Sequence, residues 1–160
     1  MPNIPRIGDE APDFNAKAHT GETISLSSLK GRWVVLYFFP KAFTPGCTSE
    51  TKSFASLWNR FRDIGALVIG ISRDDVGTLA RFAREYGVNF VLVSDSDGMI
   101  TRSYGVLGLL GLAVRVTYII DPKGRIAGII KGFSIRPDKH PIETLKVIEQ
   151  KSQEQRDYVT

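Results

Sequence analysis

The sequence predicts an α/β protein in which helices flank a central mixed sheet. Three observations lead to this prediction: a continuous apolar run over residues 33–39, a helix-like pattern after it, and a second apolar run over residues 66–71. Apolar strands without polar alternation are typical of parallel sheets that are covered on both faces. Strand, helix and strand at this spacing form a βαβ unit whose two strands pair in parallel.

The first part of the chain predicts a short antiparallel element and then the first buried strand. Residues 13–26 indicate a hairpin or an extended segment, with a turn at Thr20 and Gly21. The apolar run over residues 33–39 follows. Pro40 ends it, because proline has no N–H to donate to a central ladder.

A helix is expected over about residues 45–64. Its apolar side chains recur at the spacing of one helical face, and they are Phe54, Leu57, Trp58, Phe61 and Ile64. Gly65 is a natural residue to end this helix, because glycine readily adopts the left-handed conformation found just beyond helix ends.

The βαβ pattern is then repeated. Asp74 or Asp75 is expected to cap a second helix, which closes at Gly87. Residues 90–93 read as the next strand, and residues 94–98 as a turn. Three strands joined by two helices therefore form the first half of the predicted sheet.

The C-terminal part changes character. Residues 113–121 and 125–131, separated by a turn, indicate an antiparallel hairpin. A last helix is expected over about residues 141–150, and the polar tail over about residues 151–160 is expected to fray. The element order βαβαβ followed by ββα predicts a thioredoxin-like fold with an N-terminal extension, as a single domain over residues 1–160.

Composition places the chain among ordinary globular proteins. It has 160 residues, of which 42% are hydrophobic and 24% are charged, enough for one core without disulfides. No apolar stretch approaches the roughly 20 residues that a membrane span needs. The first residues lack a basic segment followed by an apolar one, so no secretory signal and a cytoplasmic location are expected.

The single cysteine, Cys47, excludes an internal disulfide and a Cys-x-x-Cys pair. His19 and His140 are isolated in the sequence, so we expect no metal and no other cofactor. The formal charge is +4, but the Lys and Arg residues are scattered rather than clustered. We therefore expect no nucleic-acid partner.

Cys47 is the candidate nucleophile. It lies seven residues before Phe54, on the same helix face and in the first turn. A buried structural cysteine would fit this position too. Its neighbours favour a reactive thiolate: Thr44 is a plausible N-cap, Pro45 suits the first helical position, and Gly46 allows close approach to the backbone. Backbone N–H groups at a helix start stabilise a thiolate.

Arg115 is the second candidate, because it is a lone charge within an apolar segment. If its strand runs antiparallel to residues 33–39, Arg115 points into the loop that carries Cys47. A guanidinium there would favour the thiolate further. The alternative is that Arg115 extends to solvent or pairs with a carboxylate such as Glu50.

The pattern Pro40-x-x-x-Thr44-x-x-Cys47 resembles the active-site motif of peroxiredoxins. The segments "GDEAPDF", "FTPGCTSE", "VIGISRDD", "SDSDG" and "RVTYIIDPKGRI" extend this resemblance over more than a hundred residues. They are similar to the branch called bacterioferritin comigratory protein, or peroxiredoxin Q.

The resemblance implies a role for each residue of the motif. Cys47 would attack the peroxide O–O bond and become a sulfenic acid. Thr44 would direct its hydroxyl toward the thiolate and the peroxide, and Arg115 would stabilise the thiolate and the developing negative charge. Pro40 would shield the pocket from water. Thr44 cannot freely serve as helix cap and substrate ligand at once.

One position departs from the family pattern. Many members of this branch have a second cysteine five residues after the first, where this chain has Lys52. That position faces roughly 140° away from Cys47 on a helix. The chain therefore resembles a one-cysteine peroxiredoxin, which reduces hydrogen peroxide and organic hydroperoxides as a monomer or homodimer. Its external reductant would be thioredoxin, glutaredoxin or a small thiol.

Two other functions remain open at this point. A peroxide sensor would use the same Cys47 chemistry without rapid turnover. A thioredoxin-fold binding module would carry a cysteine of ordinary reactivity.

Overall fold

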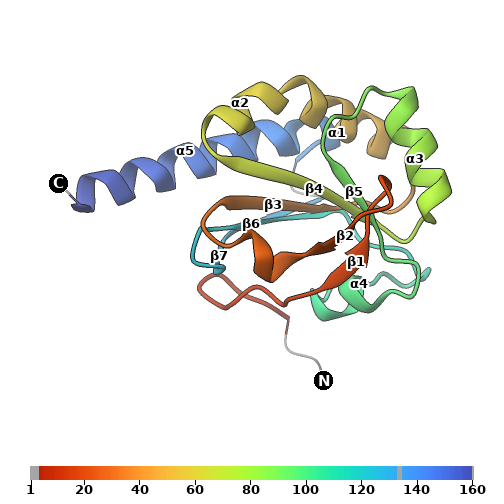
Figure 1. Ribbon diagram of the computed structural model, residues 1–160, viewed down its shortest axis with the longest axis horizontal. Coiled ribbons are helices and arrows are strands. Elements are labelled where there is room, and N and C mark those ends of the chain that lie inside the picture. The colour runs from red at the N-terminus through yellow and green to blue at the C-terminus, as the bar shows by residue number, and fades with distance from the viewer. Residues whose placement is uncertain (1–3, 133–134, 160) are drawn as a thin grey trace.

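The computed structural model describes residues 4–132 and 135–159. A five-stranded sheet in the order β5-β4-β3-β6-β7 forms its centre (Figure 1). The strands are β3 (Trp33–Phe38), β4 (Ala66–Ser72), β5 (Val91–Ser94), β6 (Val116–Ile120) and β7 (Ile126–Lys131). Strands β3, β4 and β5 are parallel, whereas β6 is antiparallel to both β3 and β7. The mixed sheet expected from the sequence is confirmed.

Helices cover one face of the sheet, and shorter elements cover the other (Figure 1). The first group is α1 (Pro45–Ser56), α2 (Trp58–Asp63), α3 (Val76–Glu85) and α5 (His140–Val159). The second group is β1 (Asn15–Lys17), β2 (Thr23–Ser25), the 3₁₀ helix η1 (Leu26–Leu29) and α4 (Met99–Ser103). A second 3₁₀ turn, η2 (Pro137–Lys139), leads into α5.

Strand β3 is the centre of the core, because all six of its residues are buried. Val35 and Tyr37 belong to the core cluster on the sheet face covered by α1, α2, α3 and α5. Leu36 and Phe38 belong to the cluster on the opposite face, covered by β1, β2, η1 and α4. Fully burying a side chain of this size contributes roughly 1.5–3 kcal/mol. The carboxyl end of β3, where the active-site loop begins, is thus anchored on both faces.

The helix expected over residues 45–64 is broken at Leu57, so the expectation of one helix was wrong. Leu57 has φ −98° and ψ 5°, outside helical values. The Ser56 hydroxyl donates to the Ser53 carbonyl, 2.9 Å away, which also accepts from the Leu57 N–H. Such competition for a carbonyl bends helices. Phe54 and Phe61, on either side of the break, still enter one core cluster.

Two further differences concern helices. Helix α4 follows the turn at residues 94–98 and was not expected. It forms because the buried Asp95 carboxylate accepts from the backbone N–H groups of Ile100 and Thr101. Helix α5 extends to Val159 rather than ending near Gln150.

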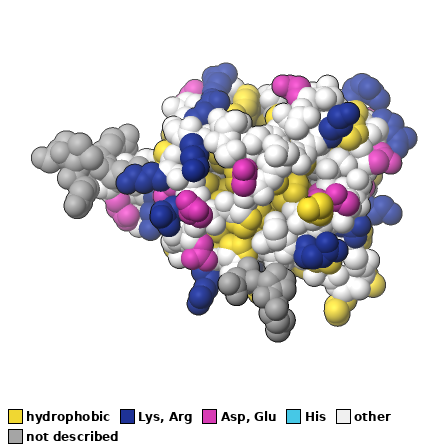
Figure 2. Space-filling view, turned by 60° about the horizontal axis from the view of Figure 1, so that its bottom comes forward, with side chains coloured by type: hydrophobic (Ala, Val, Ile, Leu, Met, Phe, Trp, Pro, Cys, Tyr) yellow, Lys and Arg dark blue, Asp and Glu magenta, His cyan; other side chains and the backbone are white. Residues whose placement is uncertain are grey.

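Other expected features are confirmed. Strands β1 and β2 form the N-terminal hairpin. Asp75 caps α3 by accepting from the Thr78 N–H at 2.7 Å. Within the described ranges, no helix is both long enough and apolar enough to cross a membrane. On the face seen in Figure 2, Lys and Arg side chains are interspersed with Asp and Glu.

Candidate active site

The loop that follows β3 is held from two sides. Half-buried Pro40 lies two residues beyond the end of β3, and the Ala42 N–H donates to Asp74 Oδ2 at 2.8 Å. Phe43 has φ 69°, a left-handed conformation that costs energy in residues other than glycine. Its ring packs edge-on against Phe82 of α3, with centroids 5.1 Å apart. Neither Asp74 nor Phe43 was assigned a role in this loop from the sequence.

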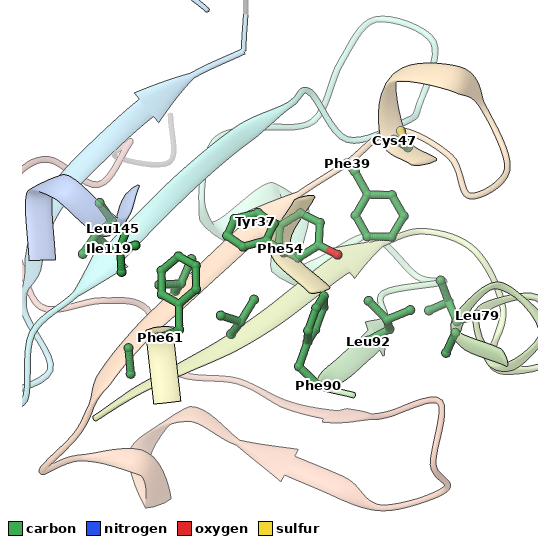
Figure 3. Close-up of a cluster of buried hydrophobic side chains, with 14 of the residues drawn as sticks. Tyr37, Phe39, Cys47, Phe54, Phe61, Leu79, Phe90, Leu92, Ile119 and Leu145 are labelled. Atoms are coloured by element: carbon green, nitrogen blue, oxygen red, sulfur yellow. The ribbon is translucent and has the colours of Figure 1, made fainter. Parts of the chain in front are cut away.

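Cys47 lies in the first turn of α1 and is completely buried. Figure 3 shows it at one end of the core cluster, beside Phe39. Its location, after Pro45 at the helix start, is the predicted one. Backbone N–H groups without helical partners, together with the positive end of the helix dipole, favour negative charge at this position.

Arg115 joins Cys47 to Glu50. It directly precedes β6, whose first residue, Val116, pairs with Phe38 at the end of β3. Arg115 Nη2 donates to Cys47 Sγ at 3.3 Å, and Nη1 donates to Glu50 Oε1 at 2.6 Å. The predicted approach to Cys47 is confirmed. The alternative, pairing with Glu50, occurs through the other arm of the same guanidinium.

Two glycines make room for Arg115. A Cβ atom on Gly46 would lie 3.0 Å from Arg115 Nη2, closer than ordinary contacts allow. A Cβ atom on Gly132 would collide with the Arg115 backbone. The close approach that we expected at Gly46 is therefore made by the protein's own guanidinium.

Thr44 occupies the N-cap position, but its side chain does not cap α1. Its hydroxyl instead donates to the Lys41 carbonyl at 2.6 Å. The expectation that Thr44 is a side-chain cap was wrong, because the tight loop brings the Lys41 carbonyl within reach. The hydroxyl oxygen retains acceptor capacity, and contact with substrate stays a prediction.

Glu50 and His140 form a buried pair next to Arg115. Both side chains are completely buried, and His140 Nδ1 lies 3.6 Å from Glu50 Oε2. Burial raises the pKa of Glu50 to about 8, although Arg115 opposes this. Burial and the Arg115 charge lower the pKa of His140 to about 4, although a backbone hydrogen bond with Gly132 opposes this.

The sequence analysis gave His140 no role and named Glu50 only as an alternative partner of Arg115. The spacing of Glu50, three residues after Cys47 on one helix, could have shown that it shares the site. No local signal singles out His140, because only the packing of α5 brings it to Glu50.

The lowered His140 pKa predicts that the stability contributed by this residue is lost in acid. The raised Glu50 pKa gives a slope of opposite sign above pH 4.5, so the effect of His140 is the difference between the natural protein and its variant. The folded value, about 4, is below the ordinary 6.5, so the unfolded chain binds more protons between these values. Stability from this residue is complete above pH 6.5 and declines as the pH falls toward 4, by about 3 kcal/mol at most. The free energy of unfolding in urea is measured for the natural protein and for His140→Asn between pH 4 and 6.5. The natural protein should lose more stability than the variant as the pH falls. Equal pH slopes would contradict the prediction.

Within the residues that the structure describes, no group of three or more His, Cys, Asp or Glu side chains could hold a metal ion. Lys52 is exposed, whereas Cys47 is buried, so the two face different sides of α1 as predicted.

The fold and the site define a thioredoxin-like protein built around one arginine-bound cysteine. The chain belongs to the AhpC/TSA family, which its residues 7–129 match. That span contains Cys47 and Arg115 and ends before His140.

Similar proteins are named peroxiredoxins. The chain is 41% identical, over 89% of its length, to the chloroplastic peroxiredoxin Q of Triticum aestivum. It spans 66% of that protein, just under two thirds of its length.

Solved structures show the same architecture along nearly the whole chain. The peroxidoxin BcpB of Mycobacterium tuberculosis is 34% identical with a TM-score of 0.85, covering 91% of this chain and 97% of that one. The bacterioferritin comigratory protein of Xanthomonas campestris is 28% identical with a TM-score of 0.83, covering 91% and 98%.

Proposed function

We propose that the protein is a thiol-dependent peroxidase that reduces hydrogen peroxide and organic hydroperoxides through Cys47. The contact of 3.3 Å between Arg115 Nη2 and Cys47 Sγ, at a helix start, is the observation that carries the proposal. Family membership supports it. The cited structure of the Xanthomonas campestris protein concerns alkyl peroxide reduction activity, which supports organic hydroperoxides as substrates.

In the first step, the Cys47 thiolate attacks one peroxide oxygen. The S–O bond forms as the O–O bond breaks, so the sulfur loses two electrons and the peroxide gains them. The departing alkoxide or hydroxide takes up a proton and leaves as an alcohol or water. Cys47 becomes a sulfenic acid.

Three neighbours assist this step. Arg115 favours the thiolate before the attack and stabilises negative charge on the oxygens during it. The Thr44 hydroxyl orients the peroxide, and Pro40 restricts water in the pocket. A thiolate nucleophile and donors fixed near the developing charge together provide the rate enhancement.

An external thiol completes the cycle. It attacks the sulfenic sulfur, water leaves and a mixed disulfide forms, and a second thiol then releases the Cys47 thiol. Thioredoxin, glutaredoxin or a small thiol would serve this monomer or homodimer. Because reduction needs external thiols, a reducing compartment such as the cytoplasm is the proposed location.

Steady-state peroxide consumption with each of these reductants tests the proposal. Sustained turnover is expected with at least one of them. A single equivalent of peroxide consumed, with no further turnover in the presence of any reductant, would favour a peroxide sensor instead.

The oxidised product is predicted from Lys52. With no second cysteine in the chain, one equivalent of peroxide should yield Cys47 sulfenic acid, and excess peroxide sulfinic acid. Because the sulfur is completely buried, a disulfide between two chains should form slowly unless the first turn of α1 unwinds. Intact mass measures the oxidation state of Cys47, and non-reducing electrophoresis measures the disulfide between chains. Cys47→Ser is the unmodified control. Rapid, near-complete conversion to a covalent dimer would rule out the external-thiol mechanism.

A further inference from the structure

The buried pair Glu50 and His140 lies within the site, but the reaction above makes no use of it. One oxygen of Glu50, Oε1, accepts from Arg115 at 2.6 Å. Within the described part of the chain, the other oxygen, Oε2, has no hydrogen-bond partner. A buried carboxyl oxygen without a partner is costly, so its surroundings need an explanation.

His140 is the polar group that faces this oxygen. Its Nδ1 atom lies 3.6 Å from Glu50 Oε2 and 3.1 Å from Thr117 Oγ1. A neutral histidine with its hydrogen on Nε2 presents Nδ1 as an acceptor. In this form the Thr117 hydroxyl donates to Nδ1, so a protonated Glu50 would share that acceptor with it, whereas an ionised Glu50 is repelled. The Nε2–H then has no hydrogen-bond partner among the described residues.

The protonation state of Glu50 determines how the positive charge of Arg115 is divided between Glu50 and Cys47. Arg115 is the cation in contact with both Glu50 and Cys47. If both were ionised, two buried anions would share one guanidinium. If Glu50 is neutral, the positive charge of Arg115 is available to the Cys47 thiolate alone.

Other ionisable groups around the pair do not replace His140. From β3, the Tyr37 hydroxyl contacts Thr51 Oγ1 at 3.0 Å, and burial raises the pKa of Tyr37 well above its ordinary value, so it is neutral. From η2, Asp138 pairs with Arg136 near the surface, and Lys139 is exposed. From α5, the half-exposed Glu143 pairs with Lys146.

We propose that His140 is a positioning residue: by accepting a hydrogen bond from protonated Glu50, it keeps that carboxyl neutral and leaves the Arg115 charge to Cys47. For this hydrogen bond to form, the 3.6 Å between Nδ1 and Glu50 Oε2 must shorten by a few tenths of an ångström. The raised Glu50 pKa, about 8, and the lowered His140 pKa, about 4, agree with a neutral pair at neutral pH. The inference rests on the proposed function, in which Cys47 reacts as a thiolate.

The protonation of Glu50 is measured directly in the natural protein. Carbon NMR of protein labelled at glutamate carboxyl carbons follows each titration, and Glu50→Gln identifies the Glu50 signal. We expect Glu50 to be protonated at pH 7 and half-ionised near pH 8. An ionised Glu50 at pH 6 to 7 would overturn the proposal, whatever the His140 variants do.

A double-mutant cycle tests the role of His140. The readout is the rate of Cys47 alkylation by iodoacetamide as a function of pH, which needs no peroxide. His140→Phe keeps a ring of similar size but removes the acceptor, so Glu50 should ionise about one pH unit lower. Alkylation should then slow about threefold at pH 7.5 and about tenfold at pH 9. His140→Asn offers a carbonyl oxygen near the Nδ1 position and should remain within about twofold of the natural protein.

The matched background is Glu50→Gln, whose side chain cannot ionise. There, adding His140→Phe should change the alkylation profile no further. An equal slowing in both backgrounds would show that His140 acts through packing and not through Glu50. No slowing in either background would show that His140 does not influence Cys47. Alkylation profiles as expected, combined with an absence of peroxide turnover, would contradict the peroxidase and leave the role of His140 intact.

Discussion

Replacing Cys47 with serine is expected to reduce peroxide consumption to the uncatalysed background. A serine hydroxyl stays protonated at neutral pH and is a poor nucleophile without an adjacent base. The chain has no other cysteine to take over. The measurement is thiol-dependent loss of hydrogen peroxide and of an organic hydroperoxide at equal protein concentrations.

The serine variant should fold, so that lost activity reports on chemistry. Cys47 is completely buried, and a buried hydroxyl without a partner costs about 1–3 kcal/mol. Arg115 Nη2, which donates to the sulfur at 3.3 Å, can donate to the serine oxygen instead. Thermal unfolding provides the check. Peroxidase activity retained in folded Cys47→Ser would disprove the assignment of Cys47 as nucleophile.

Replacing Arg115 with leucine is expected to slow peroxide attack by about 10²-fold or more, the usual effect of removing one fixed donor from a reacting centre. The variant loses the hydrogen bond to Cys47 and the charge that stabilises the departing oxygen. Stopped-flow measurement of Cys47 oxidation, at peroxide concentrations below saturation, gives the second-order rate constant directly.

Glu50 complicates the stability of this variant, because it loses its partner at 2.6 Å. Removing one member of a buried pair is destabilising when the other stays charged. Because burial raises the pKa of Glu50 to about 8, the carboxyl is neutral at pH 7 and leaves no buried charge when Arg115 is removed. Arg115→Leu combined with Glu50→Gln is the matched control. Unchanged peroxide reactivity in either folded variant would assign Arg115 to packing alone.

Local patterns in the sequence determined most of the fold and the identity of the nucleophile. The apolar residues of β3, the repeated βαβ spacing and the C-terminal hairpin are each visible within a short window. Cys47 could be predicted in the same way, since Pro45 and its position after β3 place it at a helix start. The motif that includes Pro40 and Thr44 spans only eight residues.

Only the tertiary structure decided what surrounds the sulfur. The contact from Arg115 to Cys47 crosses 68 residues of sequence, and its contact to Glu50 crosses 65. The predicted antiparallel pairing of β3 with β6 was enough to bring Arg115 near Cys47, because sheet register carries information over distance. His140 reaches Glu50 through the packing of α5. The Thr44 hydroxyl binds Lys41, although its position is that of a cap. These contacts depend on how whole elements pack and on which buried polar atoms compete for one another, and neither is encoded in the spacing of neighbouring residues.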